Sequence, residues 1–271
     1  MSHPKVSIII PAFNEGARIG GTLQSVVNCI ERQHWDAEVI VVDDGSSDDT
    51  ASIVETWKQR FPRLRIIQNV ENRGKGYSIR NGVFHSDGDI VMFTDADLSA
   101  PIIEAEKLFR AIADGADVAI GSRWIERARQ AIKQPLYRRF FGRCFNGLTR
   151  TVMGLPYKDT QCGFKAFTRE AAQVIFRLQT IERWGFDPEL LFIARSLDLK
   201  IVEVPVTWGH DDRSRINYLR DGSRMLAEMS TIRFNASAGR YRRSIASITA
   251  PVGSPARSEC LPEPKLRTQP Y

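Results

Sequence analysis

Ile90-Val91-Met92-Phe93-Thr94-Asp95-Ala96-Asp97 joins an uninterrupted apolar run to two carboxylates that are one residue apart. An apolar run without polar alternation is typical of a strand covered on both faces, as in a parallel sheet. Carboxylates that follow such a strand are hard oxygen ligands, of the kind that Mg²⁺ or Mn²⁺ takes beside a phosphate. By itself the pair favours a simpler interpretation, two solvated acids in a loop, so its meaning depends on the rest of the chain.

Apolar runs alternate with amphipathic segments throughout the first half of the chain. The runs that predict strands are 6–10, 38–42, 64–67, 89–93 and 117–120. The segments with helical spacing between them are 18–31, 49–59, 77–85 and 101–113. Five repetitions of strand then helix predict an α/β fold, a mostly parallel sheet flanked by helices. In such sheets ligands bind outside the carboxyl ends of the strands, and the acidic loops fall at those ends.

The second half alternates less regularly. Further helices are expected over 135–153, 169–177, 188–196 and 217–234, and a strand over 200–206. The chain after 244 is rich in Pro, Ser and Arg, so we expect one domain over 1–243 and a flexible tail over 244–271. At the helix starts, Ser47 or Asp48 is expected to cap the second helix, and Pro101 to occupy the first position of the fourth.

The composition is that of a globular protein, and 271 residues can bury a sizeable core. No apolar run is long enough to span a bilayer, and the N-terminus lacks the pattern of a signal peptide, so we expect a cytoplasmic protein. The four cysteines are scattered without a Cys-x-x-Cys pair, which indicates neither a zinc site nor a disulfide framework.

The net charge of +6 is concentrated in one segment, 123–150, which holds eight Lys or Arg and a single acid, Glu126. Such a segment attracts anions, whether a phosphate, an acidic membrane surface or a nucleic acid. Nucleic-acid binding would call for aromatic side chains exposed on a sheet or for a recognised binding module, and neither is apparent. We therefore expect no nucleic-acid partner.

Three motifs surround the Asp95/Asp97 pair in the first half. Asp43-Asp44-Gly45-Ser46 follows a predicted strand, either as a simple turn or as carboxylates that accept from a nucleoside. Pro11-Ala12-Phe13-Asn14-Glu15 follows the first strand. Asn72-Arg73-Gly74-Lys75-Gly76 combines two glycines with two cations suited to a diphosphate, and it lacks the spacing of a Walker A loop. In this combination the chain resembles the inverting family 2 glycosyltransferases of GT-A (Rossmann-like) fold.

That resemblance implies a nucleotide-sugar donor and assigns the first-half motifs to its site. The donor residues it implies are Pro11, Asn14, Glu15, Asp43, Asp44, Arg73, Lys75, Asp95, Ala96 and, from a basic loop later in the chain, Arg215. It also implies that Asp95 and Asp97 hold Mg²⁺ or Mn²⁺, which would offset charge on the leaving nucleoside diphosphate. A departure is Tyr77, where a small residue would be usual.

Three motifs of the second half narrow the resemblance. They are Asp159-Thr160-Gln161-Cys162-Gly163-Phe164-Lys165, Arg183-Trp184-Gly185-Phe186-Asp187-Pro188-Glu189 and Glu203-Val204-Pro205-Val206-Thr207-Trp208. Together they resemble the dolichyl-phosphate β-glucosyltransferases, close to the mannosyltransferases, although the N-terminal membrane anchor of the eukaryotic members is not seen. The implied reaction moves glucose from UDP-glucose to a polyprenyl phosphate at the cytosolic membrane face. Residues 1–122 would form the nucleotide-sugar half, and 123–243 the acceptor half with its C-terminal helices.

A phosphate acceptor would arrive already charged, so the enzyme would chiefly position it, and arginines suit that task. The residues expected at the acceptor phosphate are Arg123, Arg139, Arg143, Gln161 and Lys165. The basic helix would alternatively lie on anionic lipid as a peripheral membrane surface, and the two roles are compatible.

Asp187 has two interpretations. It either acts as a catalytic carboxylate beside Asp95 and Asp97, or caps the helix expected from Pro188. Two other activities stay open: a GDP-mannose donor with the same acceptor, and transfer to a saccharide hydroxyl, for which Asp187 would be an obligatory base. The intact Asp95/Asp97 pair argues against a catalytically inactive sugar-nucleotide sensor.

Overall fold

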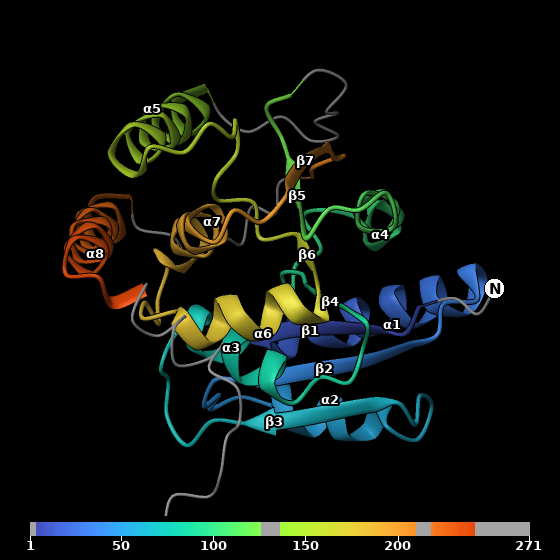
Figure 1. The fold of residues 1–271 in the computed structure, drawn as a ribbon. Coiled ribbons are helices and arrows are strands. Elements are labelled where there is room, and N and C mark those ends of the chain that lie inside the picture. Colours follow the sequence, from blue (N-terminus) through green and yellow to red (C-terminus); the bar gives the residue numbers. More distant parts are fainter. Residues whose placement is uncertain (1–3, 126–135, 210–217, 242–271) are drawn as a thin grey trace, which may run out of the picture.

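A seven-stranded sheet forms the centre of the protein, with helices on both faces (Figure 1). The computed structural model describes residues 4–125, 136–209 and 218–241. The strands are β1 (Val6–Ala12), β2 (Ala37–Asp43), β3 (Leu64–Gln68), β4 (Ile90–Phe93), β5 (Val118–Ser122), β6 (Lys165–Thr168) and β7 (Ile201–Pro205). Their order across the sheet is β3-β2-β1-β4-β6-β5-β7. All pairs are parallel except the two that β6 makes with β4 and β5, so the expected mostly parallel sheet is confirmed.

The reversed strand β6 was not predicted. Its four residues begin with a lysine, so the sequence contains no apolar run that would predict this strand. It is inserted between β4 and β5, and Met92 and Ala119 both pair with Ala166. Because β6 runs against its neighbours, its first residue, Lys165, lies at the edge where the parallel strands end.

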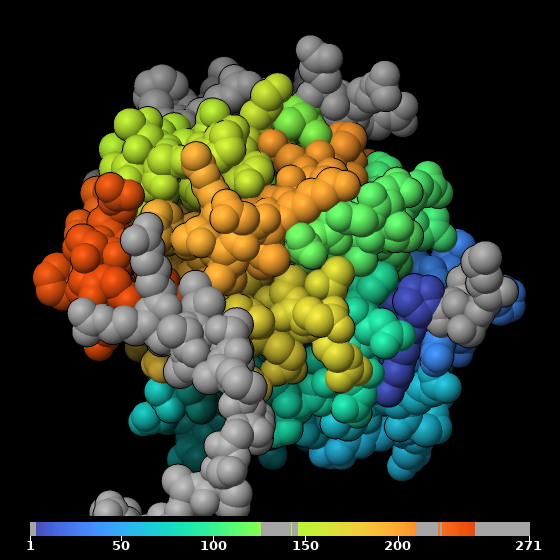
Figure 2. Space-filling view, in the orientation of Figure 1, coloured from blue at the N-terminus to red at the C-terminus, as the bar shows by residue number. Residues whose placement is uncertain are grey.

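The helices lie in two layers because successive residues of each strand point to opposite faces. Ile8 and Ile10 of β1 pack with α1, α2 and α4, whereas Ile9 packs with α3, α6 and α7. The helices are α1 (Gly16–Gln33), α2 (Thr50–Trp57), α3 (Lys75–Phe84), α4 (Ala105–Ala113), α5 (Leu136–Met153), α6 (Arg169–Leu178), α7 (Phe186–Ser196) and α8 (Tyr218–Ser237). In the space-filling view, the yellow, orange and red segments of the second half lie next to one another on the visible face (Figure 2).

Several helix starts differ from the prediction. The N-cap residue of α2 is Asp49, so the prediction of Ser47 or Asp48 at that position is wrong. Asp48 instead connects the starts of α1 and α2, because its carboxylate accepts from the N–H of Gly16 at 2.9 Å and from the N–H of Thr50 at 3.0 Å. Pro101 precedes a short 3-10 helix, Ile102–Glu104, and α4 begins only after it. The expected tail over 244–271 lies outside the described residues.

Among the helices that the structure describes, none is both long enough and apolar enough to cross a membrane.

Replacement of Ile9 by Ala tests the central position of β1. Ile9 is fully buried between the sheet and the α3/α6/α7 layer. The substitution should lower the free energy of unfolding by about 2–5 kcal/mol, because it leaves a cavity in a close-packed core. Urea denaturation measures the change. Ile103→Ala, at a side chain 42% exposed, is the control and should change stability by less than about 0.5 kcal/mol.

Candidate active site

The parallel strands bring the polar loops predicted from the sequence to one edge of the sheet. Ala12 at the end of β1 is in register with Asp43 at the end of β2, and Ile9 with Phe93 at the end of β4. The loops after these three strands therefore lie side by side, and they carry Asn14, Asp44 and Asp95 in turn. The sheet thus assembles these motifs from segments that lie far apart in the chain.

Lys75 and Asp95 form an ion pair at this edge. Lys75, at the start of α3, is 15% exposed, and Asp95 is 28% exposed. Burial works against the charged lysine, but the carboxylates of Asp95, Asp187 and Asp97 outweigh it and raise the pKa of Lys75. Lys75 therefore stays an ammonium ion, under the influence of two acids of the loop after β4 and of Asp187 in a later helix.

Asp97 lies in the same loop as Asp95. Its Oδ1 accepts a hydrogen bond from the N–H of Ser99 at 2.9 Å. Burial, and next the charge of Asp95, raise the pKa of Asp97. Such a pair of carboxylates gains from a cation between them, because each raises the cost of ionising the other.

Gly163 is a site residue that sequence reasoning missed. A methyl group added there would overlap the carboxylate of Asp95. Gly163 therefore allows the segment before β6 to pass directly behind Asp95. Its signal in the sequence was only a glycine within the Asp159–Lys165 motif, with nothing to connect it to Asp95.

Asp187 and Lys165 form a buried ion pair. The Nζ of Lys165 lies 2.5 Å from Oδ1 of Asp187 and also donates to the carbonyl of Cys162 at 2.6 Å. Asp187 is 5% exposed and Lys165 is fully buried. Burial raises the pKa of Asp187, although Lys165 and then Lys75 pull the pKa down.

The interpretation of Asp187 as a helix cap is wrong. The helix α7 begins at Phe186, its N-cap residue is Gly185, and Asp187 already lies in the first turn with its carboxylate on Lys165. The same ion pair fixes the side chain of Lys165, whose ammonium group neutralises the buried carboxylate of Asp187. Its expected contact with an acceptor phosphate stays a prediction.

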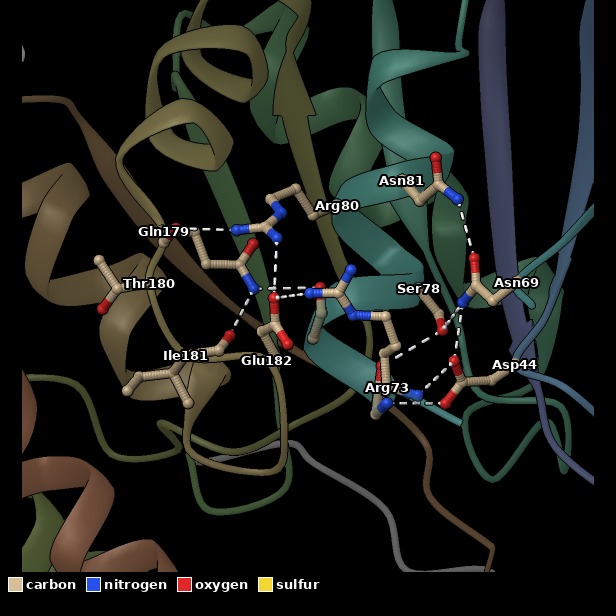
Figure 3. Close-up of polar contacts among 12 residues, drawn as sticks. Asp44, Asn69, Arg73, Ser78, Arg80, Asn81, Gln179, Thr180, Ile181 and Glu182 are labelled. Atoms are coloured by element: carbon tan, nitrogen blue, oxygen red, sulfur yellow. Dashed lines mark hydrogen bonds and ion pairs between the residues drawn. The ribbon is translucent and has the colours of Figure 1, made fainter. Parts of the chain in front are cut away.

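Asp44 anchors the loop that leads to Lys75. Figure 3 shows its carboxylate directed at the start of α3, where it accepts from the N–H groups of Arg73 at 3.1 Å and Gly74 at 2.8 Å. The amide of Asn69 donates to it at 2.7 Å. Asp44 is 3% exposed, and both of its oxygens are bonded within the protein. The observed contacts therefore position the Arg73–Lys75 loop.

The loops after β1 and β2 hold each other. Asn14, with φ of 53°, accepts on Oδ1 from the N–H of Ser47 at 2.9 Å. Asp43 accepts from the N–H of Ser46 at 3.1 Å, and Glu15 is the N-cap residue of α1. Both loops are thus fixed at the edge where a nucleoside was expected.

Two further predicted donor residues contribute backbone. Pro11 lies within β1. The carbonyl of Ala96, between the two carboxylates, accepts from the hydroxyl of Thr22 in α1. That bond fixes the backbone of the Asp95/Asp97 loop.

The side chain of Arg73 contacts Glu182 and Tyr77. Its guanidinium donates to Glu182 at 2.8 Å and lies 3.9 Å from the centre of the Tyr77 ring. Arg80 lies 5.3 Å from the centre of the same ring. It also donates to the carboxylate of Glu182 at 3.2 Å (Figure 3). Tyr77, the departure from the family pattern, therefore packs against two arginines that share one acid.

Arg123 is engaged by Asp159. Its Nε and one terminal nitrogen donate to the two carboxylate oxygens at 2.7 and 2.8 Å. Burial alone would raise the pKa of Asp159, but Arg123 lowers that pKa below its ordinary value. The guanidinium also lies 4.8 Å from the ring of Trp208. Gln161 is placed nearby, since its N–H donates to Asp159 at 3.3 Å.

Three predicted basic residues lie beyond what the structure describes. Arg139 and Arg143 belong to α5, but their side chains fall outside the described part of the chain. Arg215 lies in the undescribed range 210–217. Their expected roles at the acceptor phosphate and the diphosphate stay predictions.

Asp95 and Asp97 fit a divalent cation that is shared with a phosphate ligand. Within the described ranges, no three His, Cys, Asp or Glu side chains are grouped to hold a metal ion by themselves. Mg²⁺ in nucleotide-dependent enzymes is commonly bound through one or two carboxylates together with substrate phosphates. Two carboxylates one residue apart, Asp95 and Asp97, are that kind of incomplete ligand set.

Comparison with known proteins identifies the family. The sequence model of glycosyl transferase family 2 matches residues 7–176. The chain belongs to this family. The matched residues include the first-half motifs, both members of the Asp95/Asp97 pair, and Lys165, so the family predicted from the motifs is confirmed and the protein is a glycosyltransferase.

Two similar relatives are both named dolichyl-phosphate beta-glucosyltransferase. Dolichyl-phosphate beta-glucosyltransferase ALG5C of Trichomonas vaginalis is 40% identical over 227 residues, which cover 79% of this chain and 67% of the relative. The dolichyl-phosphate beta-glucosyltransferase of Mus musculus is 35% identical over 251 residues, 88% of this chain and 78% of the relative.

Solved structures share the fold at lower identity. Glucosyl-3-phosphoglycerate synthase from Mycobacterium tuberculosis, in complex with UDP, matches with a TM-score of 0.60 and 21% identity, over 84% of this chain and 80% of that one. Mannosyl-3-phosphoglycerate synthase from Rubrobacter xylanophilus matches with a TM-score of 0.61 and 17% identity, over 94% and 79%. The GT-A fold expected from the sequence is thereby confirmed.

Gly163→Ala tests the contact behind Asp95. The added methyl group would displace the carboxylate, and a misplacement of about 1 Å can cost about 10²-fold in rate. We therefore expect kcat/KM for sugar transfer to fall by about that factor while the melting temperature changes little. The control is Gly147→Ala in α5, where a methyl group meets no atom within 4 Å. Equal rates for the two variants would contradict the assignment.

Asp159→Asn tests the buried pair with Arg123. Its loss should lower the free energy of unfolding at pH 6 by about 3 kcal/mol, because one buried charge is left unpaired. Since the folded pKa lies below the unfolded value of about 3.9, the wild-type contribution is complete above that value and disappears as the pH falls further. The difference between wild type and variant should therefore shrink from pH 6 towards pH 3.

Urea unfolding across this pH range provides the measurement. Asp36→Asn is the matched control, since Asp36 pairs with Arg63 on the surface, and it should cost less than about 1 kcal/mol. A difference that stays constant down to pH 3 would contradict the role of Asp159.

Proposed function

We propose that the protein is an inverting glycosyltransferase that moves glucose from UDP-glucose to a dolichyl-type polyprenyl monophosphate. The observation that carries the proposal is the joint placement of Asp95, Lys75 and Asp187 at one sheet edge, in a chain 35–40% identical to named dolichyl-phosphate glucosyltransferases. That edge offers carboxylates for a cation and a lysine for a diphosphate.

The donor end of the site follows from the loops at the sheet edge. The proposed cofactor is Mg²⁺ or Mn²⁺, held by Asp95 and Asp97; the related fold of glucosyl-3-phosphoglycerate synthase has been solved with Mn²⁺ and UDP-glucose. When bound, the ion would neutralise charge on the leaving diphosphate. Lys75 would exchange part of its contact with Asp95 for a phosphate oxygen. Phe13, 42% exposed beyond β1, offers a flat face for the base.

The acceptor end favours a phosphate over a hydroxyl. A saccharide hydroxyl needs a general base within hydrogen-bond reach, whereas a phosphate monoester already carries about −1.5 to −2 charge at pH 7. The carboxylate of Asp187 is almost fully buried and is bound by Lys165, so it presents little surface to an acceptor. Attack by the phosphate in a single displacement inverts the anomeric centre.

The phosphate would lie beside Arg123 and the basic helix α5. Asp159 fixes two guanidinium nitrogens of Arg123, which leaves its remaining nitrogen for an oxygen of the acceptor. Arg139 and Arg143 belong to α5, and the polyprenyl chain would extend from here into a membrane that the protein meets from the cytosolic side.

A GDP-mannose donor is the second candidate. A glucosyl and a mannosyl synthase both share this fold, so the architecture does not select the sugar. The names of the similar relatives favour glucose.

A transfer assay tests the proposal. The protein is incubated with Mn²⁺, a polyprenyl monophosphate and either radiolabelled UDP-glucose or GDP-mannose, and the lipid is then extracted. Label from UDP-glucose is expected in the lipid, and Asp97→Asn should reduce it by about 10²-fold or more while the variant melts normally. Label from GDP-mannose alone would establish the second candidate, and label from neither would refute both.

A further inference from the structure

Trp184 is an exposed aromatic side chain beside the charged centre. It is 42% exposed, and the Nζ of Lys75 lies 5.6 Å from the centre of one of its rings. The same ammonium group contacts Asp95. Trp184 therefore borders the place where a diphosphate would meet Lys75, and it belongs to neither of the two hydrophobic clusters of the described residues.

The segment that carries Trp184 is fixed on the side of α3. The Nε2 of Gln179 donates to the carbonyl of Gly76 at 3.0 Å, and the N–H of Tyr77 donates to the carbonyl of Glu182 at 2.9 Å. Figure 3 shows that the carboxylate of Glu182 also accepts hydrogen bonds from Arg73, just before α3, and from Arg80 within it. The segment is thus attached to the helix that begins with Lys75.

The other side of the segment is fixed by two acids, of which Glu189 is buried and Glu228 is partly buried. Glu189, fully buried in α7, accepts from the N–H of Thr180 at 2.9 Å and from that of Ile181 at 2.8 Å. Glu228 of α8 accepts from the N–H of Gly185 at 2.7 Å. Bonds on both sides of Trp184 hold the backbone, so its exposure belongs to a fixed segment.

Glycines allow this close attachment. A methyl group on Gly74 would lie 2.7 Å from the carbonyl oxygen of Glu182, and one on Gly76 would lie 2.7 Å from Phe186. A methyl group on Gly185 would lie 2.6 Å from the carboxylate of Glu228. The backbone therefore approaches α3 and α8 as closely as glycine permits, and the bulky side chain between these contacts is directed outward.

From this placement we infer that Trp184 is the platform for the apolar face of the donor hexose. The role depends on the proposed function. The hexose is attached directly to the phosphate that Lys75 would contact, and the indole lies against Lys75. An aromatic face carries negative charge density, and the axial C–H groups of a pyranose are apolar and weakly positive. Trp184 would then position the sugar for attack at its anomeric carbon.

Calorimetric titration with UDP and with UDP-glucose, both in the presence of Mn²⁺, separates the sugar contact from the rest of the donor site. Trp184→Ala should weaken UDP-glucose binding about five- to tenfold and leave UDP binding unchanged, because UDP has no hexose. Trp184→Phe should restore most of the affinity. Phe84→Ala, at an aromatic side chain 44% exposed at the far end of α3, is the control and should change neither.

Steady-state kinetics give the second readout. Trp184→Ala should raise KM for UDP-glucose and leave KM for the polyprenyl phosphate unchanged. Equal weakening of UDP and UDP-glucose, an effect on the acceptor KM alone, or no effect at all would overturn the inference while leaving the proposed function intact. A wild-type protein that binds neither UDP nor UDP-glucose would overturn the proposed function itself.

Discussion

The balance of charge at the ends of β1, β2 and β4 is the constraint on which the rest of the site depends. Three carboxylates, those of Asp95, Asp97 and Asp187, meet two ammonium groups, those of Lys75 and Lys165. Each lysine is largely buried, and a buried charge without its partner is strongly destabilising. The site therefore holds its acids close together by pairing Asp95 with Lys75 and Asp187 with Lys165, and it keeps one negative charge in excess.

The acidic residues around this centre have two kinds of role. Asp44, Glu182 and Glu189 bind backbone or arginine groups of the protein and so fix the loops, whereas in the proposed function Asp95 and Asp97 would hold the cation. Acidic residues of the same type thus have different roles, because some of them accept hydrogen bonds from backbone N–H or guanidinium groups of the protein. The quoted motifs contain Asp44, Glu189, Asp95 and Asp97 alike and do not separate the two kinds.

Much of the fold was predictable because its strands are plain apolar runs. β1, β2 and β4 are buried on both faces, and parallel pairing then brings their terminal acids to one edge, as the sequence indicated. The reversed strand β6 was not predictable, since its first residue is a lysine whose partner, Asp187, lies 22 residues later. The contacts of Gly163 and Trp184 are equally invisible in sequence, because they arise only when segments far apart in the chain are packed together.

The insertion of β6 has a consequence for the order in which the chain can fold. β4 and β5 do not touch as a pair: both bond to β6, which follows them by more than forty residues. Until residue 168 has left the ribosome, one edge of β4 and both edges of β5 lack their partner strands, and such edges are prone to pair with other chains. The segments before and after residue 122 are therefore not two modules that assemble after folding. They share one sheet, and it closes late.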